Sequence, residues 1–249
     1  MKQTLLFSDV HLKVTEAARE RREAFVRFLR NIDPERFDRV ICLGDLFDFW
    51  FEYRHVVFSG YFEVLRAFRD LHEAGVELHL VCGNHDFWGG RFLREDLGFH
   101  IHPDSVVLDF RGRRAHLVHG DGVCPDDHLY RVYKRIARNP LVVGAFRLIH
   151  PDWAMAIARA VSGGSRSLQK DYDPMTGPQA VALRAYGADL IARGSADIVI
   201  CGHAHAPTVE ALEGGVYVNT GDWVGHRSHV VFDGEDFHLF TGAEAPGQP

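Results

Sequence analysis

The chain has 249 residues, of which 46% are hydrophobic and 25% are charged, a composition typical of a globular protein with a sizeable core. Its formal net charge of −6 argues against a strongly basic, nucleic-acid-binding protein, so we expect no nucleic-acid partner. No apolar stretch reaches the length of a transmembrane helix, and we expect one domain over residues 1–249.

The cysteines and the N-terminus indicate the cellular compartment. The four cysteines (Cys42, Cys82, Cys124 and Cys201) form no CxxC pair and show no spacing typical of secreted proteins. The first residues, MKQTLLFSDVH, favour a strand that runs straight into a motif, and they lack the features of a signal peptide. We therefore expect a reduced, cytoplasmic protein.

The first part of the chain alternates between predicted strands and helices. Apolar runs predict buried strands at 4–8, 39–45 and 76–84. Between them, apolar residues at helical spacing predict helices over 15–31 and about 60–74. This order of elements indicates a parallel sheet with helical crossovers.

The second part of the chain combines a hairpin, helices and further strands. Residues 106–110 and 115–121 predict a β-hairpin around the turn RGRR. Beyond it we expect, in order, an apolar helical segment over about 125–165, a helix near 178–193 and strands over 196–205, 216–223 and 228–240.

Five of these strands end in short polar motifs, namely SDVH (8–11), LGD (43–45), GNHD (83–86), HGD (119–121) and GHAH (202–205). In open α/β sheets, ligands bind in the crevice at the carboxyl ends of the strands. On an extended backbone, residues i and i+2 project to the same side. We therefore expect Asp9 with His11, and His203 with His205, to point into one shared site.

Together the motifs provide a complete set of metal ligands, namely Asp9, His11, Asp45, Asn84, His119, His203 and His205. Carboxylate, imidazole and amide donors suit Mn, Fe or Zn, and the lack of a thiolate argues against a structural zinc site. Seven ligands suit two ions about 3.5–4 Å apart with a bridging carboxylate, an arrangement that activates water for attack on a phosphoryl group. Any one motif alone more often marks a hydrogen-bonded turn, so the prediction rests on their combination.

In this order, DxH, GD, GNHD, H and GHxH resemble the motifs of the calcineurin-like metallophosphoesterase superfamily, over residues 5 to about 233. The resemblance implies an α/β fold in which helices flank a two-sheet sandwich. It implies one metal held by Asp9, His11, Asp45 and His205, and a second held by Asp45, Asn84, His119 and His203, with Asp45 bridging. It also implies that His85 stabilises the transition state or protonates the leaving oxygen, and that Asp86 orients His85.

A closer resemblance is to the UDP-2,3-diacylglucosamine diphosphatases of lipid A biosynthesis. It is carried by LGDLFDFWF (43–51), by HGDGVCPDDHLY (119–130) and by the helical insertion over about 125–170. In that family the insertion is a lid whose apolar lining accepts acyl chains. The resemblance implies cleavage of the pyrophosphate of UDP-2,3-diacylglucosamine to UMP and 2,3-diacylglucosamine 1-phosphate, with substrate contacts from Asp127, Tyr130, Arg166 and Lys170. The best-known members carry an arginine where this chain has His85.

The same resemblance implies the cofactors and partners. We expect two divalent ions, first of all Mn with Fe or Zn as alternatives, a phosphorylated glycolipid substrate, and transient contact of residues 140–161 with the inner face of the cell membrane. The sequence does not indicate an oligomeric state. One alternative is a metallophosphoesterase that acts on a soluble nucleotide or another phosphoester. A non-catalytic scaffold is a remote alternative, because every ligand and His85 are present.

Overall fold

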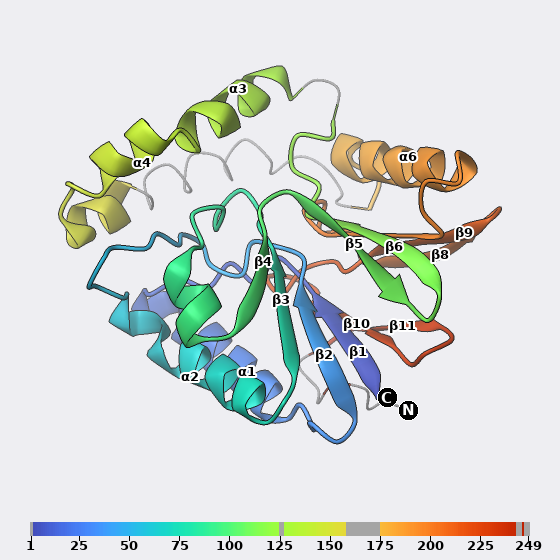
Figure 1. The fold of residues 1–249 in the computed structure, drawn as a ribbon, viewed down its shortest axis with the longest axis horizontal. Coiled ribbons are helices and arrows are strands. Elements are labelled where there is room, and N and C mark those ends of the chain that lie inside the picture. Colours follow the sequence, from blue (N-terminus) through green and yellow to red (C-terminus); the bar gives the residue numbers. More distant parts are fainter. Residues whose placement is uncertain (1, 125–126, 158–174, 243–245, 247–249) are drawn as a thin grey trace.

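Two β-sheets packed face to face form the centre of the computed structural model, which describes residues 2–124, 127–157, 175–242 and 246 (Figure 1). The first sheet has six strands in the order β11–β10–β1–β2–β3–β4, and the second has five in the order β5–β6–β7–β9–β8. In chain order the strands are β1 (Gln3–Phe7), β2 (Phe37–Cys42), β3 (Glu77–Val81), β4 (Phe99–His102), β5 (Ser105–Phe110), β6 (Arg113–Val118), β7 (Ile198–Cys201), β8 (Thr208–Leu212), β9 (Gly215–Asn219), β10 (His229–Phe232) and β11 (Phe237–Phe240).

The strand directions confirm the predicted parallel sheet and the predicted hairpin. Strands β1 to β4 are parallel, with α1 (Arg19–Arg30) and α2 (Phe62–Glu73) as crossovers. Strands β10 and β11 extend this sheet in antiparallel fashion. In the second sheet, β6, β7 and β9 are parallel, while β5 and β8 pair antiparallel with β6 and β9.

Three clusters of buried apolar residues hold together the predicted two-sheet sandwich flanked by helices. Helices α1 and α2 cover the outer face of the first sheet with buried side chains that include Phe25, Phe28 and Phe68. Helix α6 (Pro178–Ala192) covers the outer face of the second sheet. A third apolar cluster fills the space between the sheets, with Leu6 and Ile41 facing residues of the second sheet. Figure 1 shows α1 and α2 on one side and α6 on the other.

The predicted helical insertion starts with α3 (His128–Ala137) and α4 (Pro140–Phe146), and residues 151–157 are also helical. We refer to residues 128–157 as the arm, and Figure 1 shows its helices α3 and α4 apart from both helical layers. The arm packs on the loop after β2 through an apolar cluster that includes Phe49, Phe51, Val143, Phe146 and Met155. Residues 158–170 of the predicted insertion lie outside the described part of the chain.

Two features of the fold differ from the sequence prediction. Strands β4 and β8 and the π-helix η3 (Phe92–Asp96) were not predicted. The short helices η1 (Glu16–Ala18) and η2 (Ser59–Tyr61) lie at the starts of the two predicted helices. The strands that precede the motifs also end earlier than expected, β1 at Phe7, β2 at Cys42 and β7 at Cys201. The polar motifs therefore lie in the loops that follow the strands.

Candidate metal centre

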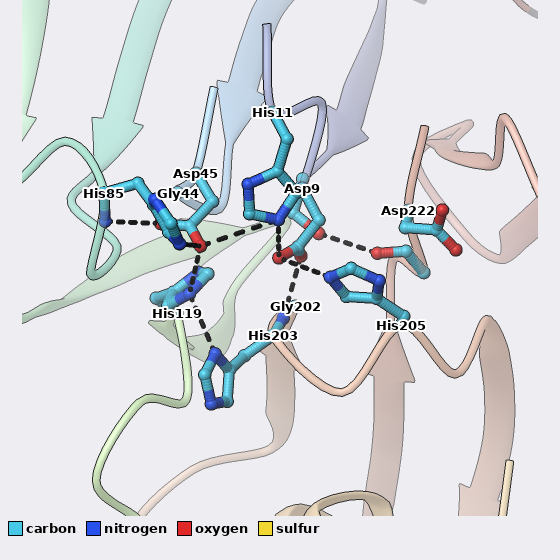
Figure 2. Close-up of polar contacts among 12 residues, drawn as sticks. Asp9, His11, Gly44, Asp45, His85, His119, Gly202, His203, His205 and Asp222 are labelled. Atoms are coloured by element: carbon cyan, nitrogen blue, oxygen red, sulfur yellow. Dashed lines mark hydrogen bonds and ion pairs between the residues drawn. The ribbon is translucent and has the colours of Figure 1, made fainter. Parts of the chain in front are cut away.

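The motif loops of both sheets meet at one place, where the seven residues predicted as metal ligands gather. Figure 2 labels all of them except Asn84. Asp9, His11, Asp45 and Asn84 follow β1, β2 and β3 of the first sheet, whereas His119, His203 and His205 follow β6 and β7 of the second. The centre therefore spans the two sheets.

Five of these residues have a left-handed backbone, with φ of 53° at Asp9, 46° at His11, 52° at Asp45, 64° at His203 and 53° at His205. Residues other than glycine rarely adopt this conformation, and backbone strain of this kind concentrates at functional sites. The prediction that the i and i+2 residues project from an extended strand is therefore wrong. The side chains of the DxH and GHxH motifs nevertheless meet in one site. The rings of His11 and His205, for example, lie 5.5 Å apart between centroids.

One group of donors forms around Asp9. The Nε2 atoms of His205 and His11 lie 3.2 and 3.7 Å from Asp9 Oδ1. His11 Nε2 also lies 3.8 Å from Asp45 Oδ2, so it stands between the two carboxylates. Asp9, His11 and His205 can all direct one ligand atom toward a common point.

A second group of donors forms around His119. Its Nε2 lies 3.5 Å from Asp45 Oδ2, 3.3 Å from Asn84 Oδ1 and 3.2 Å from His203 Nδ1. The other ring nitrogen, Nδ1, lies 2.6 Å from the carbonyl of Leu43, which fixes the ring with Nε2 directed into the centre. Asp45 belongs to both groups, as a bridging ligand would.

Each carboxylate uses one oxygen for the backbone and turns the other inward. Asp9 Oδ2 accepts a hydrogen bond from the backbone N–H of His203 (2.8 Å), and Asp45 Oδ1 accepts one from the N–H of His85 (2.9 Å). Asp9 Oδ1 is buried, and no donor among the described residues forms a hydrogen bond with it. A buried carboxylate oxygen without a hydrogen bond is costly unless a cation satisfies it.

The electrostatics of the centre also fit cations. Burial raises the pKa of the Asp9 carboxyl, but His205 and His11 outweigh this effect and hold the pKa well below its usual range. Burial lowers the pKa of His119, but Asp45, Asp9 and Asp121 together outweigh burial and raise the pKa well above its usual range. Burial and the neighbouring His119 lower the pKa of His203 to about 4. The ionised carboxylates thus attract positive charge, and neutral His203 is in the form that binds a metal.

The family profile of the calcineurin-like phosphoesterases matches residues 2–207. The chain belongs to the calcineurin-like phosphoesterase family. Membership in this metallophosphoesterase family confirms the predicted reaction class and implies bound divalent metal, for which the Asp/His groups described above are the candidate site.

Relatives of this phosphoesterase include three proteins named UDP-2,3-diacylglucosamine hydrolase. The protein from Porphyromonas gingivalis is 33% identical over 78% of this chain and 80% of its own length. The protein from Serratia proteamaculans is 33% identical over 84% of each chain. The protein from Neisseria gonorrhoeae is 31% identical over 98% of this chain and 99% of its own length.

His85 of this phosphoesterase lies at the edge of the metal centre. Its Nε2 is 3.9 Å from Asp45 Oδ2, and its Nδ1 is 2.8 Å from the backbone carbonyl of Asp48. The carboxylate of Asp86 instead accepts hydrogen bonds from the backbone N–H groups of Gly83 and Leu46, both 2.8 Å long. The geometry thus assigns the orientation of the His85 ring to Asp48, whereas Asp86 joins the loops after β2 and β3.

Three acidic residues near the centre were missed by the sequence prediction. The carboxylate of Asp48 can share a common point with His11 and His85. Asp222 is buried beside His205 (Figure 2). Burial lowers the pKa of His205, but Asp9 and, to a smaller extent, Asp222 raise this pKa above its usual value. Asp121 is the last residue of HGD, and its side chain is 3% exposed. Asp222 ends a TGD motif like LGD and HGD, so the sequence contained a signal for it.

The predicted substrate-binding residues have different environments. Asp127 precedes the first residue of α3. The hydroxyl of Tyr130 donates a hydrogen bond of 2.6 Å to Asp121 Oδ2 and is thus engaged within the protein. Arg166 and Lys170 lie outside the described residues, so their predicted role stays a prediction.

Proposed function

We propose that this phosphoesterase hydrolyses UDP-2,3-diacylglucosamine to UMP and 2,3-diacylglucosamine 1-phosphate, a reaction of lipid A biosynthesis. The observation that carries the proposal is the extent of the match to named hydrolases. The Neisseria gonorrhoeae protein aligns over 98% of this chain, so the similarity includes the arm as well as the metal loops. The exposed apolar residues of the arm support a substrate that carries acyl chains.

We further propose that the centre holds two Mn²⁺ ions. Asp9, His11, Asp45 and His205 would hold one, and Asp45, Asn84, His119 and His203 the other. When bound, two divalent cations supply activated water at neutral pH and offset the negative charge of the phosphoryl oxygens. Only Asp9 and Asp45 of the seven ligands are formally negative, so the loaded centre keeps positive charge for the pyrophosphate.

The residues around the centre supply orientation and a proton. The Nδ1–H of His85 donates to the Asp48 carbonyl, so Nε2 faces the site. When the ring is protonated at both nitrogens, Nε2 can donate its proton to the oxygen that leaves phosphorus, and the ring becomes neutral. The carbonyl of Leu43 fixes His119, and the N–H of His203 fixes Asp9. These contacts hold the ligands in place before substrate binds.

The proposed contact with a membrane would use the outer side of the arm. Within the predicted range 140–161, Leu141 is 82% exposed, Leu148 88% and Trp153 71%, and Arg147 immediately precedes Leu148. No helix in the described ranges is long and apolar enough to cross a membrane. Exposed apolar side chains next to cationic ones favour shallow binding to an anionic lipid surface.

This membrane contact is tested by co-sedimentation with anionic phospholipid vesicles. We expect Trp153→Ser to lower the bound fraction several-fold, because the indole no longer enters the interface. Phe62→Ser is the matched control, since Phe62 is 60% exposed and belongs to α2 rather than to the arm. Equal binding of both variants and the parent protein would contradict the assignment.

The activity is tested with purified protein, Mn²⁺ and UDP-2,3-diacylglucosamine in detergent. We expect release of UMP by the parent protein and its loss in Asp45→Asn, because Asp45 belongs to both donor groups. Cleavage of bis-4-nitrophenyl phosphate without release of UMP would keep the phosphoesterase and reject the lipid substrate. Failure on both substrates would also reject catalysis at this centre.

A further inference from the structure

Helix α3 is held in place by polar contacts rather than by apolar packing. Of its ten residues only Ala137 is buried. Its large apolar side chains are turned outward, and Leu129 and Ile136 are 87% and 56% exposed. A helix usually docks through a buried apolar stripe, and in its absence the few polar contacts of α3 determine its position.

The strongest of these contacts lead to the loop that carries His119. Lys134 Nζ and the hydroxyl of Tyr130 each lie 2.6 Å from Oδ2 of Asp121. Asp121 follows His119 by two residues, with Gly120 between them in a left-handed conformation (φ 120°). The side chain that anchors α3 therefore belongs to the loop that supplies a predicted metal ligand.

A second contact leads to the loop that carries His85. The indole Nε1–H of Trp88 donates a hydrogen bond of 3.0 Å to the carbonyl of Ala137, at the last residue of α3. Trp88 follows His85 by three residues. Both ends of α3 are thus tied to loops of the metal centre, one from each sheet.

The ion pair of Asp121 and Lys134 is largely shielded from solvent. The side chain of Asp121 is 3% exposed and that of Lys134 is 18% exposed, so water screens the pair weakly. Lys134 also lies 3.5 Å from Asp104, which in turn pairs with Arg138 at the end of α3. Loss of Lys134 would leave the buried charge of Asp121 without its cation, an arrangement that favours displacement of the helix.

We propose that Asp121 and Lys134 form a latch that holds α3 against the metal-centre loops and thereby determines recognition of the lipid part of the substrate. This inference rests on the proposed function. A small diester reaches the metal centre without the arm, whereas a diacylated substrate needs the arm in place. Asp121 and Lys134 are therefore positioning residues that act through α3.

The test compares Lys134→Met with Arg135→Met, which removes the same charge from the exposed neighbouring position of the same helix. We expect Lys134→Met to raise KM for UDP-2,3-diacylglucosamine about ten-fold while kcat, and turnover of bis-4-nitrophenyl phosphate, stay within two-fold of the parent protein. We expect the amides of α3 to exchange with deuterium at least ten-fold faster. Lys134→Arg can still pair with Asp121 and should have the KM and the α3 exchange rates of the parent protein. Arg135→Met should leave both quantities unchanged.

Each outcome bears on the latch. Unchanged exchange in Lys134→Met would show that the pair does not hold α3. Faster exchange with an unchanged KM would reject the role in recognition, and a parallel loss of turnover on both substrates would place Lys134 in the chemistry instead. If the parent protein released no UMP, the proposed function would fail, and the exchange rates would still decide whether the latch exists.

Discussion

At the scale of single residues, the glycines before the ligands permit the loops to approach one another. Gly44 has φ 95°, and a Cβ at this position would lie 2.5 Å from His119 Nδ1 and 2.7 Å from the N–H nitrogen of Gly83. Both distances are far below van der Waals contact. The glycine in LGD is therefore needed for packing between the two sheets as much as for its own backbone conformation.

We expect Gly44→Ala to lower kcat at least ten-fold and to weaken Mn²⁺ binding, because His119 must move away from Asn84 and Asp45. Gly112→Ala is the matched control, since Gly112 has φ 80° with no atom within 4 Å of its Cβ position. The control should lose about 1–2 kcal/mol of stability through backbone strain alone and keep its kcat. Equal kcat in both variants, measured with bis-4-nitrophenyl phosphate, would contradict the steric argument.

His85 should act on the reaction and leave metal binding intact. We expect His85→Ala to lower kcat by about 10²–10⁴-fold, the usual contribution of a general acid. Mn²⁺ content by elemental analysis should equal that of the parent protein, because His85 is outside the two proposed ligand groups. Loss of bound Mn²⁺ in this variant would instead make His85 a ligand.

At the scale of elements, the sequence predicted the strands that are continuous apolar runs ending in a motif, such as β1, β2, β3 and β7. It missed β4, because two histidines among its four residues conceal the apolar pattern. It also missed the left-handed backbone of the ligands, since residue type alone does not determine φ. The role of Asp48 was not predictable either, because a backbone carbonyl has no signal in the sequence.

Strand β10 contains a histidine that makes stability depend on pH. His229 is 1% exposed, its ring stacks on Phe240 at 5.2 Å between centroids, and neither ring nitrogen has a hydrogen-bond partner among the described residues. Burial lowers its pKa from the ordinary 6.5 to about 4. Below pH 6.5 the imidazole of His229 is protonated in the unfolded chain but stays neutral in the folded chain. The free energy of unfolding therefore falls as the pH drops toward 4.

Between pH 7 and pH 5, we expect the free energy of unfolding to fall by roughly 2 kcal/mol less in His229→Phe than in the parent protein. Phenylalanine keeps the stacking without a titrating group. Urea unfolding of the parent protein and the variant at both pH values measures this difference. His55→Phe, at an exposed position, is the control and should keep the slope of the parent protein. An unchanged slope in His229→Phe would show that His229 has the same pKa in the folded and the unfolded chain.

At the scale of the whole molecule, the metal centre joins the two sheets, since its ligands come from loops of both. A cation bound there stabilises the folded state, in which alone these ligands are assembled. We expect Mn²⁺ at 100 times its Kd to raise Tm by roughly 10–20 °C, from about 2.7 kcal/mol at each of the two sites. EDTA should reverse the rise, and Asp45→Asn should show little of it in differential scanning fluorimetry. If the Tm of the parent protein were the same with and without Mn²⁺, the result would argue against an assembled centre.

The most direct test of the dinuclear metal centre is anomalous diffraction from crystals grown with Mn²⁺. We predict two manganese peaks about 3.5–4 Å apart, one on each side of Asp45. One peak should lie among Asp9, His11 and His205, and the other among Asn84, His119 and His203. A single peak, or peaks bound by other residues, would contradict the dinuclear centre on which the proposed reaction depends.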